Sequence, residues 1–161
     1  MVETRKKIEQ RLSVLHGADL SGVHHAAAML TLGCGPLAEV RNFRGRVKRV
    51  GKWALHVQCD WRIERAGAAI ATRADLCGSD EDAQGTADRL YDALVRPAPV
   101  SVEHLSADEA GGLVLALSRE YRLIVMPDDA GDSEDWRFFA TGVDAAHLVM
   151  AGGAIAPESF D

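Results

Sequence analysis

Histidine and cysteine side chains are the groups in this chain best suited to bind a metal or act as nucleophiles, but their spacing matches no common site. His56 and Cys59 stand three residues apart, and the other two cysteines, Cys34 and Cys77, are distant from them in the sequence. Zinc sites usually combine two closely spaced pairs of ligands. On a regular strand, His56 and Cys59 would also point to opposite faces. The sequence therefore predicts no metal site.

Motifs for covalent catalysis and for phosphate binding are also missing. The sequence has no G-x-S-x-G, and the glycines at 33, 35, 111 and 112 form neither a P-loop nor a dinucleotide-binding motif. His104 and Asp108 could form a dyad, but a surface histidine is the simpler interpretation. We therefore expect no cofactor, assign no catalytic residues and favour a protein that is not an enzyme.

Residues 41–52 are the most distinctive polar stretch, because they include six basic residues and no acidic one. The favoured interpretation is a solvated ribbon whose charges discourage association between strand edges. The other is a surface that binds an acidic protein partner, with Phe43 and Val47 providing apolar contacts. The residues assigned to that surface are Arg41, Phe43, Arg44, Arg46, Lys48, Arg49 and Lys52.

The charge balance of the chain limits its partners. Its 24 acidic residues outnumber its 18 basic ones, for a formal net charge of −6 at pH 7. Duplex nucleic acid is not expected to bind, because it would meet one favourable ribbon on an otherwise repulsive surface. We expect a homodimer, in which an acidic loop at residues 127–135 is one candidate contact for the basic stretch. The acids of that loop lack EF-hand spacing; they are Asp128, Asp129, Asp132, Glu134 and Asp135.

Residues 52–64 are predicted to form one long strand at the centre of a sheet. Every second residue from Trp53 to Ile63 is apolar, and most of the residues between them are polar. This period of two is the pattern of a strand with one buried face. A small-ligand or enzyme site built from dispersed residues around this strand is the alternative to a protein-binding surface. Its candidate members are His56, Asp60, Arg62 and Trp136.

Two helices are predicted, over residues 3–16 and 79–96. The first has an apolar stripe of Ile8, Leu12 and Leu15, and the second begins at Ser79, a suitable N-cap before three acidic residues. Between them, the sequence predicts a loop or irregular strand start over 19–25 and a buried strand over 26–34. Glycine and proline at 35 and 36 are expected to end that strand, and a second is expected over 37–41.

The last third of the chain is predicted to be almost entirely β-structure. Strands are expected at residues 100–105, 113–117, 121–126, 136–141 and 147–150. The tripeptide Asp-Trp-Arg at 60–62 recurs at 135–137. One explanation is an internal duplication with halves 26–75 and 100–156, and the other is coincidence between apolar strands.

These patterns together favour a single α+β domain over residues 1–161. We expect a mainly antiparallel sheet or split barrel of about eight strands, with two packing helices. Hydrophobic residues make up 47% of the chain, but no apolar run approaches the roughly 20 residues that span a bilayer. No membrane association is expected. The odd number of cysteines and the absence of a signal-peptide pattern favour a reducing cytoplasm.

Function is predicted only at the level of a class. The sequence favours a soluble protein of bacterial type that serves as a non-catalytic binding or protein-interaction domain, for example in an antitoxin-like or immunity-like role. The missing catalytic motifs and the separate basic and acidic stretches favour this class. The small enzyme or ligand-binding domain remains the alternative, and a deep pocket lined by titratable side chains would favour it.

Overall fold

The computed structural model describes residues 3–128 and 133–160, which contain two α-helices and eleven strands. The helices are α1 (Thr4–Leu12) and α2 (Asp80–Leu94). The strands are β1 (Leu20–Ala26), β2 (Met29–Arg41), β3 (Val47–Val57), β4 (Asp60–Arg65), β5 (Ala68–Thr72), β6 (Val102–Ala107), β7 (Leu113–Leu117), β8 (Tyr121–Met126), β9 (Glu134–Ala140), β10 (Leu148–Ala151) and β11 (Ala154–Ile155). Short 3₁₀ turns follow α1 (η1, Ser13–Leu15) and β5 (η2, Arg73–Leu76).

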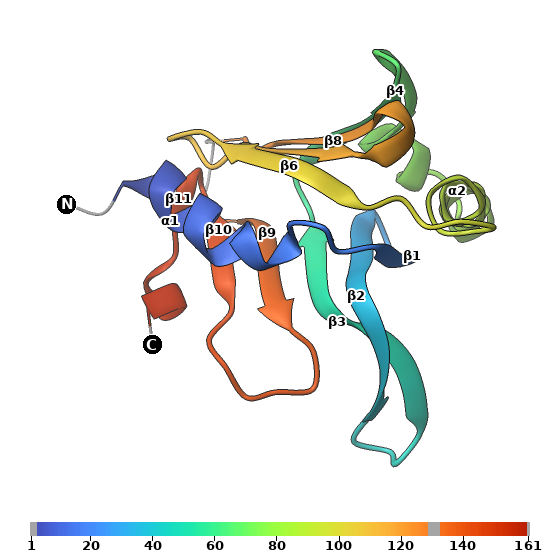
Figure 1. Cartoon of the computed structure of the whole chain (residues 1–161), viewed down its shortest axis with the longest axis horizontal. Helices are drawn as coiled ribbons and strands as arrows, with labels where there is room; N and C mark the ends of the chain where they lie inside the picture. Colours follow the sequence, from blue (N-terminus) through green and yellow to red (C-terminus); the bar gives the residue numbers. More distant parts are fainter. Residues whose placement is uncertain (1–2, 129–132, 161) are drawn as a thin grey trace.

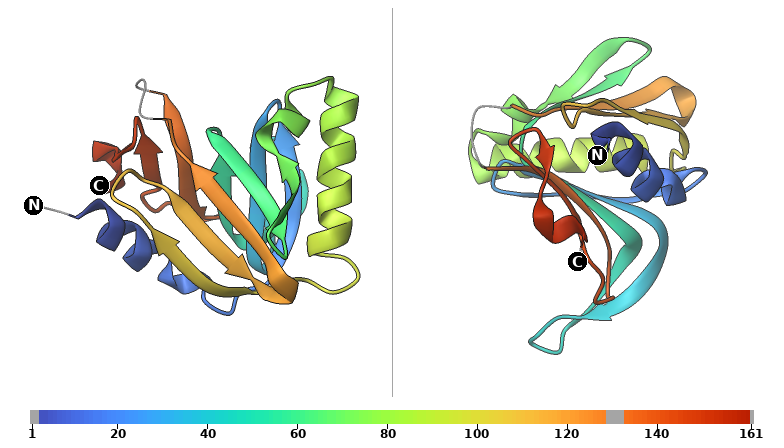
Figure 2. Two further views of the ribbon diagram at one scale, coloured as in Figure 1. Left: turned by 90° about the horizontal axis from the view of Figure 1, so that it is seen from above. Right: turned by 90° about the vertical axis from the view of Figure 1, so that its left-hand side faces the viewer.

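The strands form two antiparallel sheets, as Figures 1 and 2 show. The first sheet has the order β1-β2-β3-β9-β10-β11, and the second has the order β5-β4-β8-β7-β6. The predicted α+β class and antiparallel pairing are therefore confirmed. The expected number of about eight strands was too low, and the strands divide between two sheets that do not close into a barrel.

The alternating segment 52–64 belongs to two strands in different sheets, which corrects the prediction of one long strand. β3 lies in the first sheet and β4 in the second. At the bend, the backbone N–H groups of Gln58 and Cys59 donate to the carbonyl oxygen of Asp135, at 2.8 and 3.0 Å. Because alternate side chains stay buried on both sides of the bend, the period of two continues across it.

The second half of the chain crosses between the sheets in the opposite direction. β8 pairs with β4 in the second sheet, and β9 pairs with β3 in the first. Strands β1 to β5 correspond, in sequence order, to strands β6 to β10. When each strand of β1-β2-β3-β9-β10 is replaced by its counterpart, the result is β6-β7-β8-β4-β5, which is the order of the second sheet read from its other end. The helices follow the same relation, since α1 packs on β6 and α2 packs on β1. Each half therefore contributes strands to both sheets.

The hydrophobic core includes large side chains from both sheets and both helices. Trp61 of β4 is buried as predicted, and Trp136 of β9 is also buried, whereas Trp53 of β3 is only partly buried. Ile8 and Leu12 of α1 join this core. The two predicted helices are thus present, with the end of the first converted into the turn η1.

Helix α2 begins as its sequence predicts. The hydroxyl oxygen of Ser79 accepts a hydrogen bond from the backbone N–H of Asp82 at 3.0 Å. This bond satisfies one of the free donors of the first turn, where Asp80, Glu81 and Asp82 also favour the helix dipole.

The N-terminal hairpin differs from its prediction at both strands. Residues 20–26 form the regular strand β1, and β2 continues through Gly35 and Pro36. The register between β2 and β3 shifts between Cys34 and Leu37, so that Gly35 and Pro36 form an irregularity in the pairing. Gly35 has a φ of 84°. The missing N–H of Pro36 does not interrupt pairing with β1, because that pairing has already ended at Cys34.

The β2–β3 hairpin extends beyond the other strands of its sheet, and Figure 1 shows it projecting at the bottom of the molecule. β1 pairs with β2 only as far as Cys34, and β9 pairs with β3 only from Trp53 onward. Residues 37–51 therefore form a two-stranded projection, which we call the arm. The right-hand view of Figure 2 shows the arm pointing away from the second sheet.

Candidate functional site

The basic stretch of the sequence begins at Arg41, the last residue of β2, and continues through the tip and the second strand of the arm to Lys52 at its base. All six of its lysine and arginine residues are exposed. Among the residues that the structure describes, none of the six lies within ion-pair distance of a carboxylate. The arm therefore concentrates positive charge that the rest of the described chain does not neutralise.

The tip of the arm is an ordered turn that presents an aromatic ring. The side-chain oxygen of Asn42 accepts hydrogen bonds from the backbone N–H groups of Arg44 and Arg46, at 2.9 and 3.0 Å. Gly45 takes a φ of 76°, which a residue with a Cβ rarely adopts. Phe43 is 93% exposed, and the guanidinium of Arg44 lies 5.4 Å from the centre of its ring.

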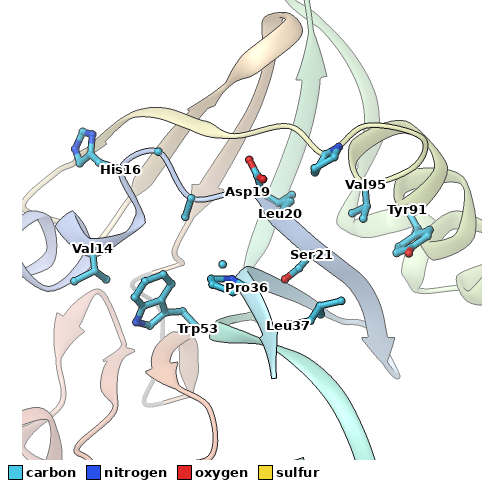
Figure 3. A pocket seen from close by; sticks show the side chains of 14 residues that line it. Val14, His16, Asp19, Leu20, Ser21, Pro36, Leu37, Trp53, Tyr91 and Val95 are labelled. Atoms are coloured by element: carbon cyan, nitrogen blue, oxygen red, sulfur yellow. The ribbon is translucent and has the colours of Figure 1, made fainter. Parts of the chain in front are cut away.

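An apolar groove of about 580 Å³ lies at the base of the arm. Figure 3 shows it between the chain after α1, the start of β1, the base of the β2–β3 hairpin and the end of α2. The large side chains that line it are Val14, Leu20, Leu37, Trp53, Tyr91 and Val95. Val14 and Leu37 are 49% and 44% exposed, so the groove has accessible apolar walls.

Trp53 links the groove to the basic arm. The ammonium nitrogen of Lys52 lies 4.9 Å from the centre of the Trp53 ring, a cation–π contact. A Cβ at position 35 would lie 2.8 Å from the ring, so glycine at this position lets the backbone of β2 pack closely against Trp53. Continuing from the groove along the arm, Val47 is a further exposed apolar side chain at 46%.

A second hollow, of about 300 Å³, lies on the face of the first sheet opposite its core side chains. We call this face of the first sheet the outer face. His24, Thr31, His56 and Arg137 occupy adjacent positions on neighbouring strands, and the first three line the hollow. The hydroxyl oxygen of Ser21, which also lines it, is buried and has no hydrogen-bond partner among the described residues.

A polar network on the outer face surrounds His56. Arg137 donates to the carboxylate of Glu134 and lies 2.9 Å from Nδ1 of His147. The ring of Phe139 lies between two imidazoles, stacked on His147 and edge-to-face with His56.

These surroundings shift three pKa values downward. Burial, and then the charge of Arg137, lowers the pKa of His56 and that of His147. The hydrogen bond from Arg137 lowers the pKa of Glu134. The neutral forms of both histidines are therefore favoured.

The four candidate residues of the alternative pocket do not surround one cavity. His56 lies on the outer face, whereas Trp136 is buried and donates its indole N–H to the carbonyl oxygen of Gly111 at 2.8 Å. Asp60 forms an ion pair with Arg73 at 3.7 Å. Arg62 lies 2.7 Å from the carboxylate of Glu64, which also accepts from Arg122.

The acidic loop of the sequence is only partly within the described residues. Asp129 and Asp132 lie outside them. Asp135 is buried and accepts a hydrogen bond from the N–H of Gly153, and Glu134 belongs to the network with Arg137. These two carboxylates therefore have structural roles within the first sheet.

The cysteines remain free thiols. Burial raises the pKa of Cys34 and that of Cys59 to about 12, which disfavours the reactive thiolate. In the part of the chain that the structure describes, no three His, Cys, Asp or Glu side chains are grouped so that they could hold a metal ion. No helix within residues 3–128 and 133–160 has both the length and the apolar character to cross a membrane.

No protein-family model, curated protein or solved structure matches this chain. The candidate sites therefore depend on the geometry alone. Sequence reasoning located the basic arm but missed the groove, because the groove combines residues from four separated segments. The one local signal was Leu37, an apolar residue that follows Gly35 and Pro36 at the start of a polar stretch.

Proposed function

We propose that this protein is a non-catalytic protein-interaction domain whose arm binds an acidic partner. The observation that carries the proposal is a group of six exposed basic side chains without ion-pair partners among the described residues, five on the projecting two-stranded arm and Lys52 at its base. Electrostatic complementarity would accelerate association and select against basic partners. A solvated ribbon would account for the charges, but it does not account for the apolar side chains among them.

Apolar contacts from the same surface support a protein partner over a polyanion such as DNA. Phe43 and Val47 are exposed on the arm, and Leu37 connects the arm to the groove at its base. Aromatic and arginine side chains are enriched at the centres of protein interfaces. DNA would contact the phosphate-binding charges but would leave these apolar groups unused.

The test is a charge reversal of the arm. The variant Arg44→Glu, Arg46→Glu, Lys48→Glu should fold normally, because all three side chains are exposed, and should lose the partner that wild type captures from its native source. A matched reversal at the exposed residues Arg5, Lys6 and Arg65 controls for net charge. An unchanged partner profile for the arm variant would refute the proposal. Binding to duplex DNA that resists physiological salt would refute the choice of partner.

A small-ligand site on the outer face is the second candidate function. It is favoured by the hollow beside His56 and by the buried hydroxyl of Ser21 that lacks a partner. A Cβ at Gly33 would meet only ordinary contacts at 3.4 Å or more, so Gly33→Ala should reduce the hollow without unfolding the sheet. A ligand that copurifies with wild type but not with this variant would support the second function.

Three broader expectations are also proposals. The matching order of five strands in each half supports an internal duplication, together with the repeated Asp-Trp-Arg. The free cysteines support a reducing, cytoplasmic setting.

We also propose a homodimer, because two-fold pairing would cover the apolar groove. Light scattering that gives a monomer mass across a wide concentration range would contradict the homodimer.

A further inference from the structure

The arm has an open strand edge on β3, and this edge bears on how a partner binds. Residues 47–51 pair with β2 on one side only, because β9 pairs with β3 from Trp53 to Val57. The contacts nearest the arm on that side come from Thr141. Its N–H donates to the carbonyl oxygen of Lys52, and its hydroxyl donates to the carbonyl oxygen of Gly51 at 2.6 Å. In an antiparallel ladder, alternate residues direct their N–H and C=O groups to opposite edges. The stretch 47–50 therefore has backbone donors and acceptors available to another strand.

The side chains along this edge have a simple order. Val47 and Val50 flank the basic pair Lys48 and Arg49, and the edge contains no acidic residue. The corresponding edge of β2 is less suitable, because Pro36 lacks an N–H at its start and Glu39 would repel acidic side chains. Charge and backbone availability therefore favour the β3 edge.

We propose that the acidic partner adds a strand to this open edge of β3. The inference rests on the proposed function and specifies its binding mode. An added strand takes its affinity from main-chain hydrogen bonds and its specificity from the side chains opposite the edge. The strand that fits has two acidic residues opposite Lys48 and Arg49, with an apolar residue on each side opposite Val47 and Val50.

This pattern, apolar-acid-acid-apolar, reads the same in both directions. A peptide that carries it can pair with the edge in parallel or antiparallel orientation, so the test does not depend on strand direction. The added strand would lie beside Val47–Val50, beyond Thr141 and Gly142, where Gly142 already packs against Val40 of the arm. Basic side chains that protect the edge from other copies of this chain would then attract the acidic strand.

The experiment titrates the isotope-labelled full chain with the peptide acetyl-TVEEVT-amide and follows the backbone amides by NMR. We expect shift changes centred on residues 47–51, with slower hydrogen exchange at alternate amides. The peptide acetyl-TVKKVT-amide should bind at least tenfold more weakly. The variant Lys48→Gln, Arg49→Gln should weaken binding of the acidic peptide at least fivefold, whereas Arg5→Gln, Lys6→Gln should not change it.

Two N-methylated peptides separate strand addition from simple charge attraction. One is methylated at its first, third and fifth residues and the other at its second, fourth and sixth, so each loses the donors of one edge. We expect one of them to bind like the parent and the other at least tenfold more weakly. Parent-like binding by both would overturn strand addition and leave charge-based docking on the arm intact. Absence of any shift at millimolar peptide, or shifts confined to the β2 edge, would also overturn it.

Discussion

Trp61 and Trp136 are buried to a similar extent, but their indole N–H groups have different surroundings. Trp136 donates to the carbonyl oxygen of Gly111, whereas the N–H of Trp61 has no partner among the described residues. Replacement by phenylalanine removes a hydrogen bond at one position and an unsatisfied donor at the other. We expect Trp136→Phe to reduce the free energy of unfolding by about 1–2 kcal/mol more than Trp61→Phe does.

Urea unfolding followed by circular dichroism measures this difference without relying on tryptophan fluorescence. Both variants leave a cavity of similar size, so the shared loss of packing cancels in the comparison. Equal costs at the two positions would show that the Trp61 donor has a partner in solution.

The histidines of the outer face should make stability depend on pH. The pKa values of His56 and His147 are lowered in the folded protein, so the unfolded chain takes up protons more readily as the pH falls below about 6.5. Their contribution to stability is therefore complete above pH 6.5 and declines below it. Glu134 affects stability in a separate pH range. Because its pKa is lowered from the usual value of 4.5, its contribution to stability is lost only as the pH falls below that value.

We expect the melting temperature to fall between pH 7.5 and pH 5.5, and to fall less in the variant His56→Gln, His147→Gln. The exposed pair His16 and His104, changed in the same way, provides the control. Thermal melts at the two pH values measure the effect. An identical decrease in wild type and in the outer-face variant would contradict the assignment.

At the scale of the elements, local patterns predicted most strands and both helices, but they could not reveal the bend between β3 and β4. The apolar alternation passes through Gln58 and Cys59 unchanged, because both strands bury the same set of alternate positions. The bend depends on the carbonyl of Asp135, which is distant in the sequence. Residues 19–25 were predicted only as a loop or an irregular strand start, because a bulge next to Leu20 and the exposed His24 disturb the alternation of β1.

The candidate site was predictable to the extent that it depends on local sequence. A run of basic residues around a glycine-containing turn is polar enough to be recognised as exposed, and the structure places it on the arm. The groove was not predictable, because Val14 and Tyr91 approach Trp53 only after α1 packs on β6 and α2 packs on β1. Sequence therefore identified the charges of the surface but not its apolar part.

The arm should be dispensable for folding, since its residues contribute little to the core. Ala38 and Val50 are register partners, and the alternation of pairs from the Asn42–Arg46 hydrogen bond makes them a hydrogen-bonded pair. Residues 39–49 can therefore be replaced by Asn-Gly, which favours the tight turn of a short hairpin. We expect the melting temperature to change by about 2 °C or less. Thermal melts and NMR spectra of the remaining residues test this. A large loss of stability would mean that the arm supports the fold.

At the scale of the whole molecule, the exchange of strands between the halves makes each half depend on the other. The pairs β3–β9 and β4–β8 join the halves in both sheets, and α1 and α2 each pack on a strand of the opposite half. Residues 77–79 form an exposed connection between η2 and α2. Cutting the chain there leaves every strand intact but separates each sheet into two incomplete parts.

We expect the fragments 1–78 and 79–161 to fold when they are produced together and to lack the native structure when each is alone as a monomer. Alone, fragment 1–78 would expose the unpaired edges of β3 and β4, and fragment 79–161 would expose those of β8 and β9. Each would also expose the apolar faces that the other half covers. Gel filtration should show a complex near the 17.3 kDa of the intact chain, with the same circular dichroism spectrum. A stable, monomeric fragment would show that one half contains a self-sufficient core and that the crossing strands are not needed to hold it together.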